Sequence, residues 1–150
     1  MIRELLANYP LMCGFCTWTF CQTLKMFFTG IRTHQWSFRY FWPSGGMPSS
    51  HSASVVALTV SVGLRDGFSS SLFAISMIFA CVVMYDAMGV RRETGKQGKI
   101  INEILRSHDS EIEESVSGDL KERTGHSPLE VAVGVVIGIC FALIFHLFMK

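Results

Sequence analysis

The segment from Pro128 to Met149, PLEVAVGVVIGICFALIFHLFM, is apolar apart from Glu130 near its start and His146 near its end. A helix needs about 20 predominantly apolar residues to cross the hydrocarbon core of a bilayer. A core helix of a soluble bundle normally keeps a polar stripe, which this segment lacks. We therefore predict a membrane-spanning helix here. Its Gly134-x-x-x-Gly138 spacing favours close packing of helix backbones.

Three further apolar segments precede it, at about 11–31, 47–64 and 68–90. The first contains Lys25, the second is short, and the third contains one acid, Asp86. With 150 residues, 49% hydrophobic residues and a mean hydropathy of +0.36, the chain is too apolar for an ordinary soluble domain. We predict an all-α fold: one domain over residues 1–150, an integral membrane bundle of about four transmembrane helices.

A long polar loop, at about 91–127, separates the third and fourth segments. Its first half places Ile100, Ile101, Ile104 and Leu105 on one helical face. This pattern predicts an amphipathic helix lying along the membrane surface. The second half, 108–122, is acidic and is expected to be solvated.

Composition narrows the expected partners. The net charge is +1, and nucleic-acid binding requires a one-sided basic excess, so no nucleic-acid partner is expected. All five cysteines lie in apolar segments, and Cys13-x-x-Cys16 lacks a second Cys or His pair. We therefore expect packing cysteines and no metal site.

The stretch 45–52, GGMPSSHS, precedes the second apolar segment. Glycines allow a tight turn, and Ser hydroxyls with free N–H groups at a helix start suit an anion. His51 can exchange a proton near neutral pH. Two interpretations are open from these residues alone: a phosphate site, or a capped turn that happens to contain a histidine.

Topology favours the functional interpretation. Four crossings would bring the end of the first helix, the start of the second, the end of the third and the start of the fourth to one face. Ionisable groups in or beside spans are costly in lipid and normally mark a functional site. Those at these four ends are Lys25, Arg32, His51, Asp86, Arg91, His126 and Glu130.

Three segments extend this argument: GGMPSSHSA (45–53), MYDAMGVRRETGKQ (84–97) and GHSPLEV (125–131). Together with the helix pattern, they make the chain resemble the divergent branch of the PAP2 family, membrane phosphatases related to vanadium haloperoxidases. The resemblance covers almost the whole chain. It implies an integral membrane protein of a bacterial inner membrane or a plastid membrane.

The PAP2 pattern is Lys-x6-Arg-Pro, then Pro-Ser-Gly-His, then Ser-Arg-x5-His-x3-Asp. Lys25 and Arg32 keep the first spacing, with Thr33 in place of proline. In the second part Pro48, Ser49 and His51 match, and Ser50 stands where glycine is usual.

The third part departs further from the pattern. His126 matches the histidine, and Glu130 replaces the aspartate at the same spacing. The family arginine is missing, because Arg123 lies too close to His126. Arg91 or Arg92 could supply a replacement guanidinium.

The resemblance implies roles for these residues. His126 would attack phosphorus and form a phosphohistidine, Glu130 would orient it, and His51 would serve as proton donor and then as base. Asp86 is expected to pair with Arg91 or Arg92; a divalent cation shared with Glu130 is the alternative. The expected phosphate ligands are Lys25, Arg32, Ser49, Ser50, Arg91 and Arg92, with Asp86 and Arg123 in support and no cofactor.

The function predicted from the sequence is hydrolysis of a lipid phosphate monoester. The alternative is a non-catalytic membrane protein that binds anionic lipid head groups or assembles with partners. A homo-oligomer is plausible, since four helices form a small bundle around a lipid site. Ten of the 13 Lys and Arg residues fall on the motif side, against Arg3, Arg65 and Lys150 on the other. The positive-inside rule therefore predicts a site on the cytoplasmic or stromal face.

Overall fold

The computed structural model describes residues 1–34, 37, 41, 46–107 and 125–149, with the backbone alone at 91–92, 105–107 and 149. All regular structure in these ranges is helical, which confirms the all-α prediction. The helices are α1 (Ile2–Ala7), α2 (Tyr9–Thr33), α3 (Ser50–Asp66), α4 (Ser71–Met88), α5 (Val90–Ser107) and α7 (Pro128–Met149).

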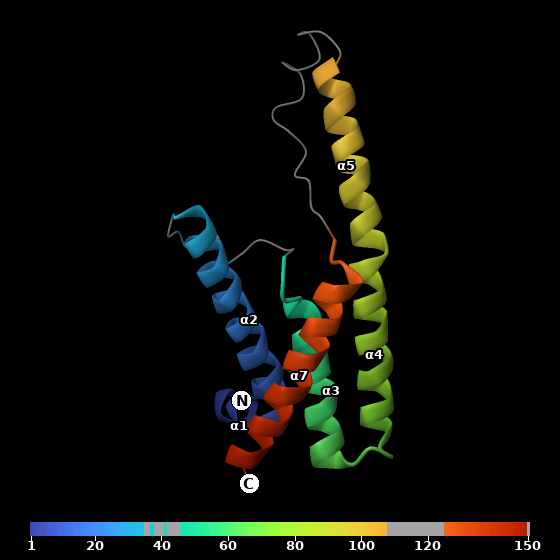
Figure 1. Ribbon diagram of the computed structural model, residues 1–150. Helices are drawn as coiled ribbons and strands as arrows, with labels where there is room; N and C mark the ends of the chain where they lie inside the picture. Colours follow the sequence, from blue (N-terminus) through green and yellow to red (C-terminus); the bar gives the residue numbers. More distant parts are fainter. Residues whose placement is uncertain (35–36, 38–40, 42–45, 108–124, 150) are drawn as a thin grey trace.

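Helix α3 lies at the centre of a four-helix bundle and packs against α2, α4 and α7 (Figure 1). Its buried positions are mostly small, among them Ser52, Ala53, Ala57, Ser61 and Gly63. Small side chains let neighbouring helix backbones approach, so one helix can contact three others.

The closest approach is between α3 and α7. A Cβ added to Gly134 would lie 2.6 Å from the carbonyl oxygen of Ser49, and one added to Gly138 would lie 2.5 Å from that of Ala53. Both neighbours are backbone atoms, one of the residue that caps α3 and one of α3 itself, so a larger residue would push the helices apart. The Gly134-x-x-x-Gly138 spacing therefore serves packing within the chain.

The helix boundaries follow the local sequence. The Asn8 side chain caps α2, and Ser49 and Ser70 cap α3 and α4 by accepting hydrogen bonds from backbone N–H groups. Gly67, with φ of 88°, ends α3 in a conformation that favours glycine.

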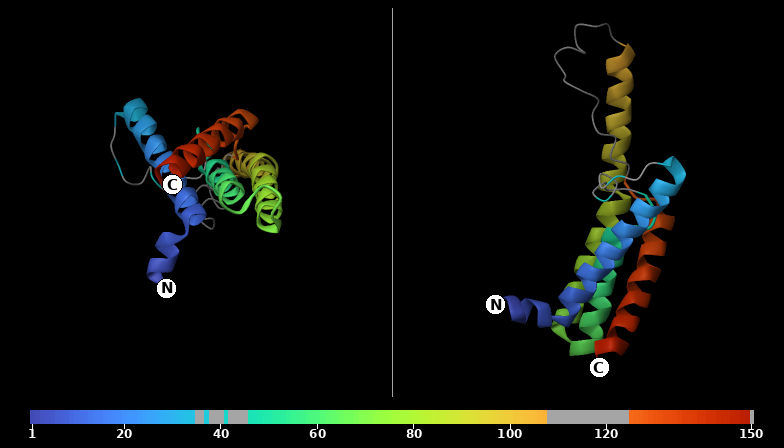
Figure 2. Two further views of the ribbon diagram at one scale, coloured as in Figure 1. Left: turned by 90° about the horizontal axis from the view of Figure 1, so that it is seen from below. Right: turned by 90° about the vertical axis from the view of Figure 1, so that its left-hand side faces the viewer.

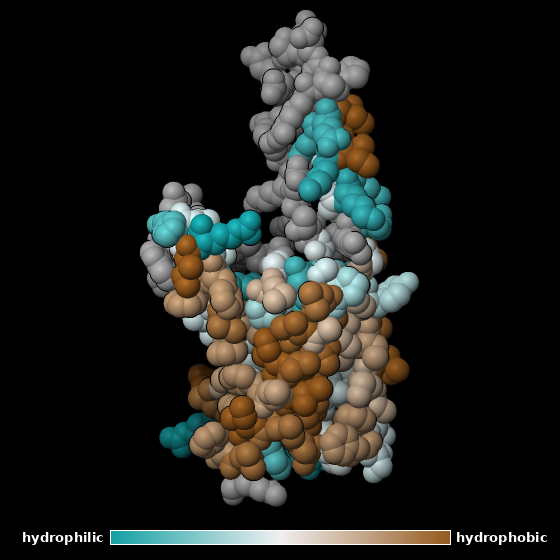
Figure 3. All heavy atoms as spheres, in the orientation of Figure 1, coloured by the Kyte–Doolittle hydropathy of each residue, from teal (hydrophilic) through white to brown (hydrophobic). Residues whose placement is uncertain are grey.

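Two helical stretches within the described residues are long and apolar enough to cross a membrane: Ser71–Ile104 and Pro128–Phe148. Neither α2 nor α3 is long and apolar enough by the same standard of length and hydropathy, and α3 has only 17 residues. The structure thus supports two spans where the sequence predicted about four. Apolar residues nevertheless cover the side of the bundle, and hydrophilic ones gather beyond one of its ends (Figure 3).

The presence of α5 confirms the helix predicted in the first half of the polar loop. Its direction differs from the one expected. It continues the line of α4 beyond the bundle rather than lying across the bundle's end (Figures 1 and 2). The reason is the short junction, since Gly89 alone separates the two helices. The expected solvated segment, 108–122, lies outside the described residues.

The expected convergence of helix ends is present. The end of α2, the start of α3, the end of α4 and the start of α7 all lie at one end of the bundle, and both chain termini lie toward the other (Figure 1). The candidate site residues that the structure describes therefore belong to a single end of the molecule, whatever the number of membrane crossings.

Candidate functional site

The turn before α3 positions Ser49 and His51. Gly46 has φ of 75°, which favours glycine, and the Met47–Pro48 peptide is cis. Ser49 is fully buried; its Oγ accepts a hydrogen bond from the N–H of Ser52 at 3.4 Å and lies 2.9 Å from Ser52 Oγ. Ser49 is thus a helix cap, as the capped-turn interpretation predicted. The sequence interpretation did not single out Ser52, although its position three residues after the cap was a signal for it.

A reciprocal cap positions His126 and Glu130. Ser127 N–H donates to Glu130 Oε2 at 3.1 Å, and Glu130 N–H donates to Ser127 Oγ at 3.3 Å. The sequence Ser127-Pro128-Leu129-Glu130 has the spacing of such a capping box, with proline at the first helical position. Glu130 Oε2 also lies 3.1 Å from His126 Nδ1, so one carboxylate holds both the helix start and the imidazole.

Two backbone hydrogen bonds join the three helix ends. Ser49 N–H donates to the Glu130 carbonyl at 3.2 Å, and His126 N–H donates to the Ala87 carbonyl at 3.0 Å. The first tie is possible because Gly134 lets α7 approach the start of α3. The start of α3, the start of α7 and the end of α4 therefore form one fixed unit.

Within this unit the two histidines face one another. The ring centroids of His51 and His126 are 6.4 Å apart, with an interplanar angle of 57°. His126 is 3% exposed, and His51 is half-buried. At this separation both imidazoles can contact one small tetrahedral anion.

Lys25 reaches the unit from α2. Its side chain is 7% exposed, and its Nζ donates to Ser50 Oγ at 3.3 Å. Among the described residues it forms no ion pair, although the Glu130 carboxylate lies near enough to favour its charge. A buried cation is costly, and an anionic ligand beside it would offset more of that cost.

A cavity of about 370 Å³ adjoins Lys25. Arg32, which is exposed on the last turn of α2, lines it with Thr29 and Thr33. Phe28 and Met47, both more than half exposed, also line the cavity. Two cations and two apolar side chains thus border one opening.

The structure describes the other predicted site residues less fully. Arg91 and Arg92 lie on the first turn of α5, but their side chains and all of Arg123 are outside the described part of the chain. Asp86 is half-buried on the last turn of α4, and its pairing with Arg91 or Arg92 stays a prediction. Within the described residues no group of three or more His, Cys, Asp or Glu side chains converges on a metal position.

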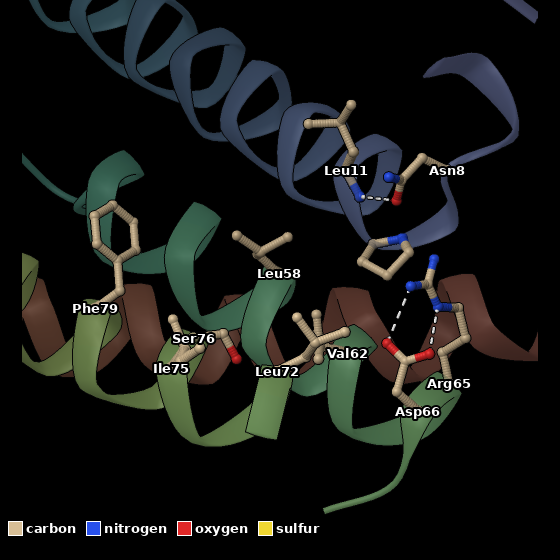
Figure 4. Close-up of a pocket in the computed structure, with 11 residues that line it drawn as sticks. Asn8, Leu11, Leu58, Val62, Arg65, Asp66, Leu72, Ile75, Ser76 and Phe79 are labelled. Atoms are coloured by element: carbon tan, nitrogen blue, oxygen red, sulfur yellow. Dashed lines mark hydrogen bonds and ion pairs between the residues drawn. The ribbon is translucent and has the colours of Figure 1, made fainter. Parts of the chain in front are cut away.

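A second cavity, of about 390 Å³, lies at the opposite end of the bundle (Figure 4). Apolar side chains of α2, α3 and α4, including Leu58, Leu72 and Phe79, form most of its wall. Its charged residues, Arg65 and Asp66, pair with each other at 2.9 Å. None of the predicted site residues with a described side chain lines it.

The positions of Lys25, Ser49, His51 and His126 fit the pattern expected of a divergent PAP2 protein. The Divergent PAP2 family matches residues 6–141, and the chain belongs to that family. Its sequence is 38% identical to the "Uncharacterized membrane protein YuiD" of Bacillus subtilis (strain 168), over 97% of this chain and 98% of that protein. No solved structure matches the chain significantly.

Proposed function

We propose that this chain is a membrane phosphatase that hydrolyses a lipid phosphate monoester through a phosphohistidine. The observation that most supports the proposal is the pair of facing histidines beside the buried Lys25, which forms no ion pair within the described residues. The family assignment and the two apolar helices are consistent with it, as is the relative described as a membrane protein.

In the proposed first step, His126 Nε2 attacks phosphorus while its Nδ1–H donates to Glu130. The bond between phosphorus and the lipid oxygen breaks, and that oxygen takes a proton from His51. In the second step a water molecule gives a proton to His51 and attacks phosphorus, so the P–N bond breaks and phosphate leaves. Both histidines return to their starting states.

Binding of the phosphoryl group would fall to the cations. Lys25 and Arg32 offset the charge of a phosphomonoester, and Ser50 adds a neutral donor. The Ser49 hydroxyl is engaged as a helix cap, so Ser49 would act on phosphate less directly than Ser50. Arg91 and Arg92 keep the phosphate-binding role predicted for them, and Asp86 and Arg123 keep their supporting role.

A lipid is the proposed substrate because the cavity beside Lys25 combines opposite chemistries. Lys25 and Arg32 suit an anionic head group, whereas exposed Phe28 and Met47 suit an acyl or prenyl chain. Phosphatidate, phosphatidylglycerophosphate and prenyl phosphates all have this combination.

A specific observation favours a second candidate, a non-catalytic binder of anionic head groups or a scaffold for partners. Ser49 and Glu130, two of the expected site residues, both make helix-capping hydrogen bonds. Selection for structure alone would retain them, and the family arginine is missing from its usual spacing.

The test is phosphate release from a panel of lipid phosphates by purified protein, beside His126→Ala and His51→Ala. The proposal expects loss of activity in both variants. Activity that survives both changes would overturn the mechanism. Head-group binding without hydrolysis of any lipid would favour the second candidate.

A further inference from the structure

Helix α5 has an exposed apolar stripe. Val90, Ile100, Ile101 and Ile104 are between 44% and 60% exposed. At 100° per residue they share one face, while Lys96, Lys99 and Glu103 lie on the other. Among the described helices α5 packs only against α4, so this face is left outside the bundle.

Basic residues outnumber acidic ones in α5. Its sequence contains five basic residues and two acidic ones: Arg91, Arg92, Lys96, Lys99 and Arg106, against Glu93 and Glu103. Lys96 pairs within the helix, since its Nζ lies 2.6 Å from Glu93 Oε1. The net excess is cationic, which is complementary to an anionic bilayer surface.

Length places α5 outside the hydrocarbon core. The helical stretch Ser71–Ile104, which includes the apolar α4 and most of α5, has 34 residues. A helix of that length spans about 51 Å, whereas the hydrocarbon core is about 30 Å thick. The 18 residues of α4 nearly fill that thickness, at about 27 Å. If α4 spans the bilayer, α5 begins where the lipid head groups are.

The junction between the helices permits a change of direction. Gly89 has φ of −97° and ψ of −90°, away from helical values. The last turn of α4 is closed by a hydrogen bond of 2.8 Å from Gly89 N–H to the Tyr85 carbonyl. Rotation at Gly89 therefore reorients α5 and leaves α4 intact, because glycine has wide backbone freedom.

We propose that α5 is a docking helix for an anionic bilayer surface, and that it turns at Gly89 to bury its isoleucine stripe among the lipids of the membrane that holds α4. The surface is the favoured occupant because α4 tethers α5 beside it and the basic face matches its charge. A second copy of the chain would match the apolar stripe but would leave the basic face without an opposite charge. This proposal stands independently of phosphatase activity.

The test uses the full chain in bilayer nanodiscs of phosphatidylcholine, with or without phosphatidylglycerol. Ile101→Cys marks the apolar face and Glu103→Cys the opposite face, and the parent chain with its five native cysteines gives the background. A water-soluble maleimide reports exposure. Phosphatidylglycerol should slow labelling of Ile101→Cys about tenfold and leave Glu103→Cys nearly unchanged.

Adding Lys96→Gln and Lys99→Gln to Ile101→Cys should reduce the effect of phosphatidylglycerol, since two of the five basic residues are removed. Equal labelling of Ile101→Cys in both lipids overturns the proposal. Protection that appears in phosphatidylcholine only when a disc holds two copies of the chain also overturns it, and assigns the stripe to self-association.

Discussion

At the scale of single residues, the site combines groups with two tasks. Glu130 holds the start of α7 and the His126 imidazole with the same oxygen. Lys25 is buried, and its ammonium group donates a hydrogen bond to the Ser50 hydroxyl. Burying this charge destabilises the fold, and a bound anion would offset that cost. Because these residues serve both structure and the proposed reaction, a useful variant changes activity without changing stability, or the reverse.

Glu130→Gln offers this separation. The amide oxygen can still accept the Ser127 N–H, so the melting temperature should change little. The amide cannot offer His126 a negative charge, and activity on a lipid phosphate should fall about 100-fold. Glu130→Ala also removes the cap and should cost about 1 kcal/mol of stability. Full activity in Glu130→Gln would show that the carboxylate serves the helix alone.

Lys25→Met tests the buried cation. Methionine fills a similar volume without a charge to desolvate, so thermal stability should hold or rise. Affinity for inorganic phosphate, measured by competition with substrate, should fall at least about tenfold, since a charge-assisted contact is lost. Unchanged affinity would remove Lys25 from the site. Thr29→Val, on the same cavity wall, is a control for packing.

At the scale of helices, small residues determine the architecture. The sequence predicted the helix at 128–149 with its observed bounds, because its apolar run is long and capped by Ser127-Pro128. It placed the other bundle helices within a few residues. It did not predict α1, a six-residue helix whose amphipathic pattern is too short to detect.

Gly138→Ala tests the helix contact that aligns the two histidines. The new Cβ would meet the Ala53 carbonyl, a backbone atom that cannot rotate away. The variant should lose roughly 1–3 kcal/mol, measured as a lowered melting temperature in detergent. Val136→Ala, on the exposed side of the same helix, should cost less than about 0.5 kcal/mol. Equal losses in the two variants would argue against close α3–α7 packing.

At the scale of the whole molecule, the sequence foresaw which ends would meet but not how they are tied. Because consecutive helices of the bundle alternate in direction, the positions of His51, His126 and Lys25 along the sequence bring them to one end. The hydrogen bonds from Ser49 N–H to Glu130 and from His126 N–H to Ala87 depend on the register of three helices, which no local pattern encodes. The direction of α5 likewise depends on two dihedral angles at Gly89.

Topology in the membrane provides a test at this scale. Both termini lie at the end opposite the site. If basic residues mark the cytoplasmic side, a C-terminal reporter that folds only in the cytoplasm should be inactive. A reporter that folds only outside the cytoplasm should be active at the same position. The reverse pattern would place the histidines on the outer face.

The central claim is that His126 accepts the phosphoryl group, and trapping tests it most directly. Purified protein is mixed with a lipid phosphate labelled at phosphorus, quenched in alkali and analysed for phosphohistidine. The account predicts label on His126 in the parent chain and none in His126→Ala. In His51→Ala, slower release of phosphate should prolong any label that forms. Labelled phosphohistidine in His126→Ala, or phosphate release by that variant at the parent rate, would contradict the account.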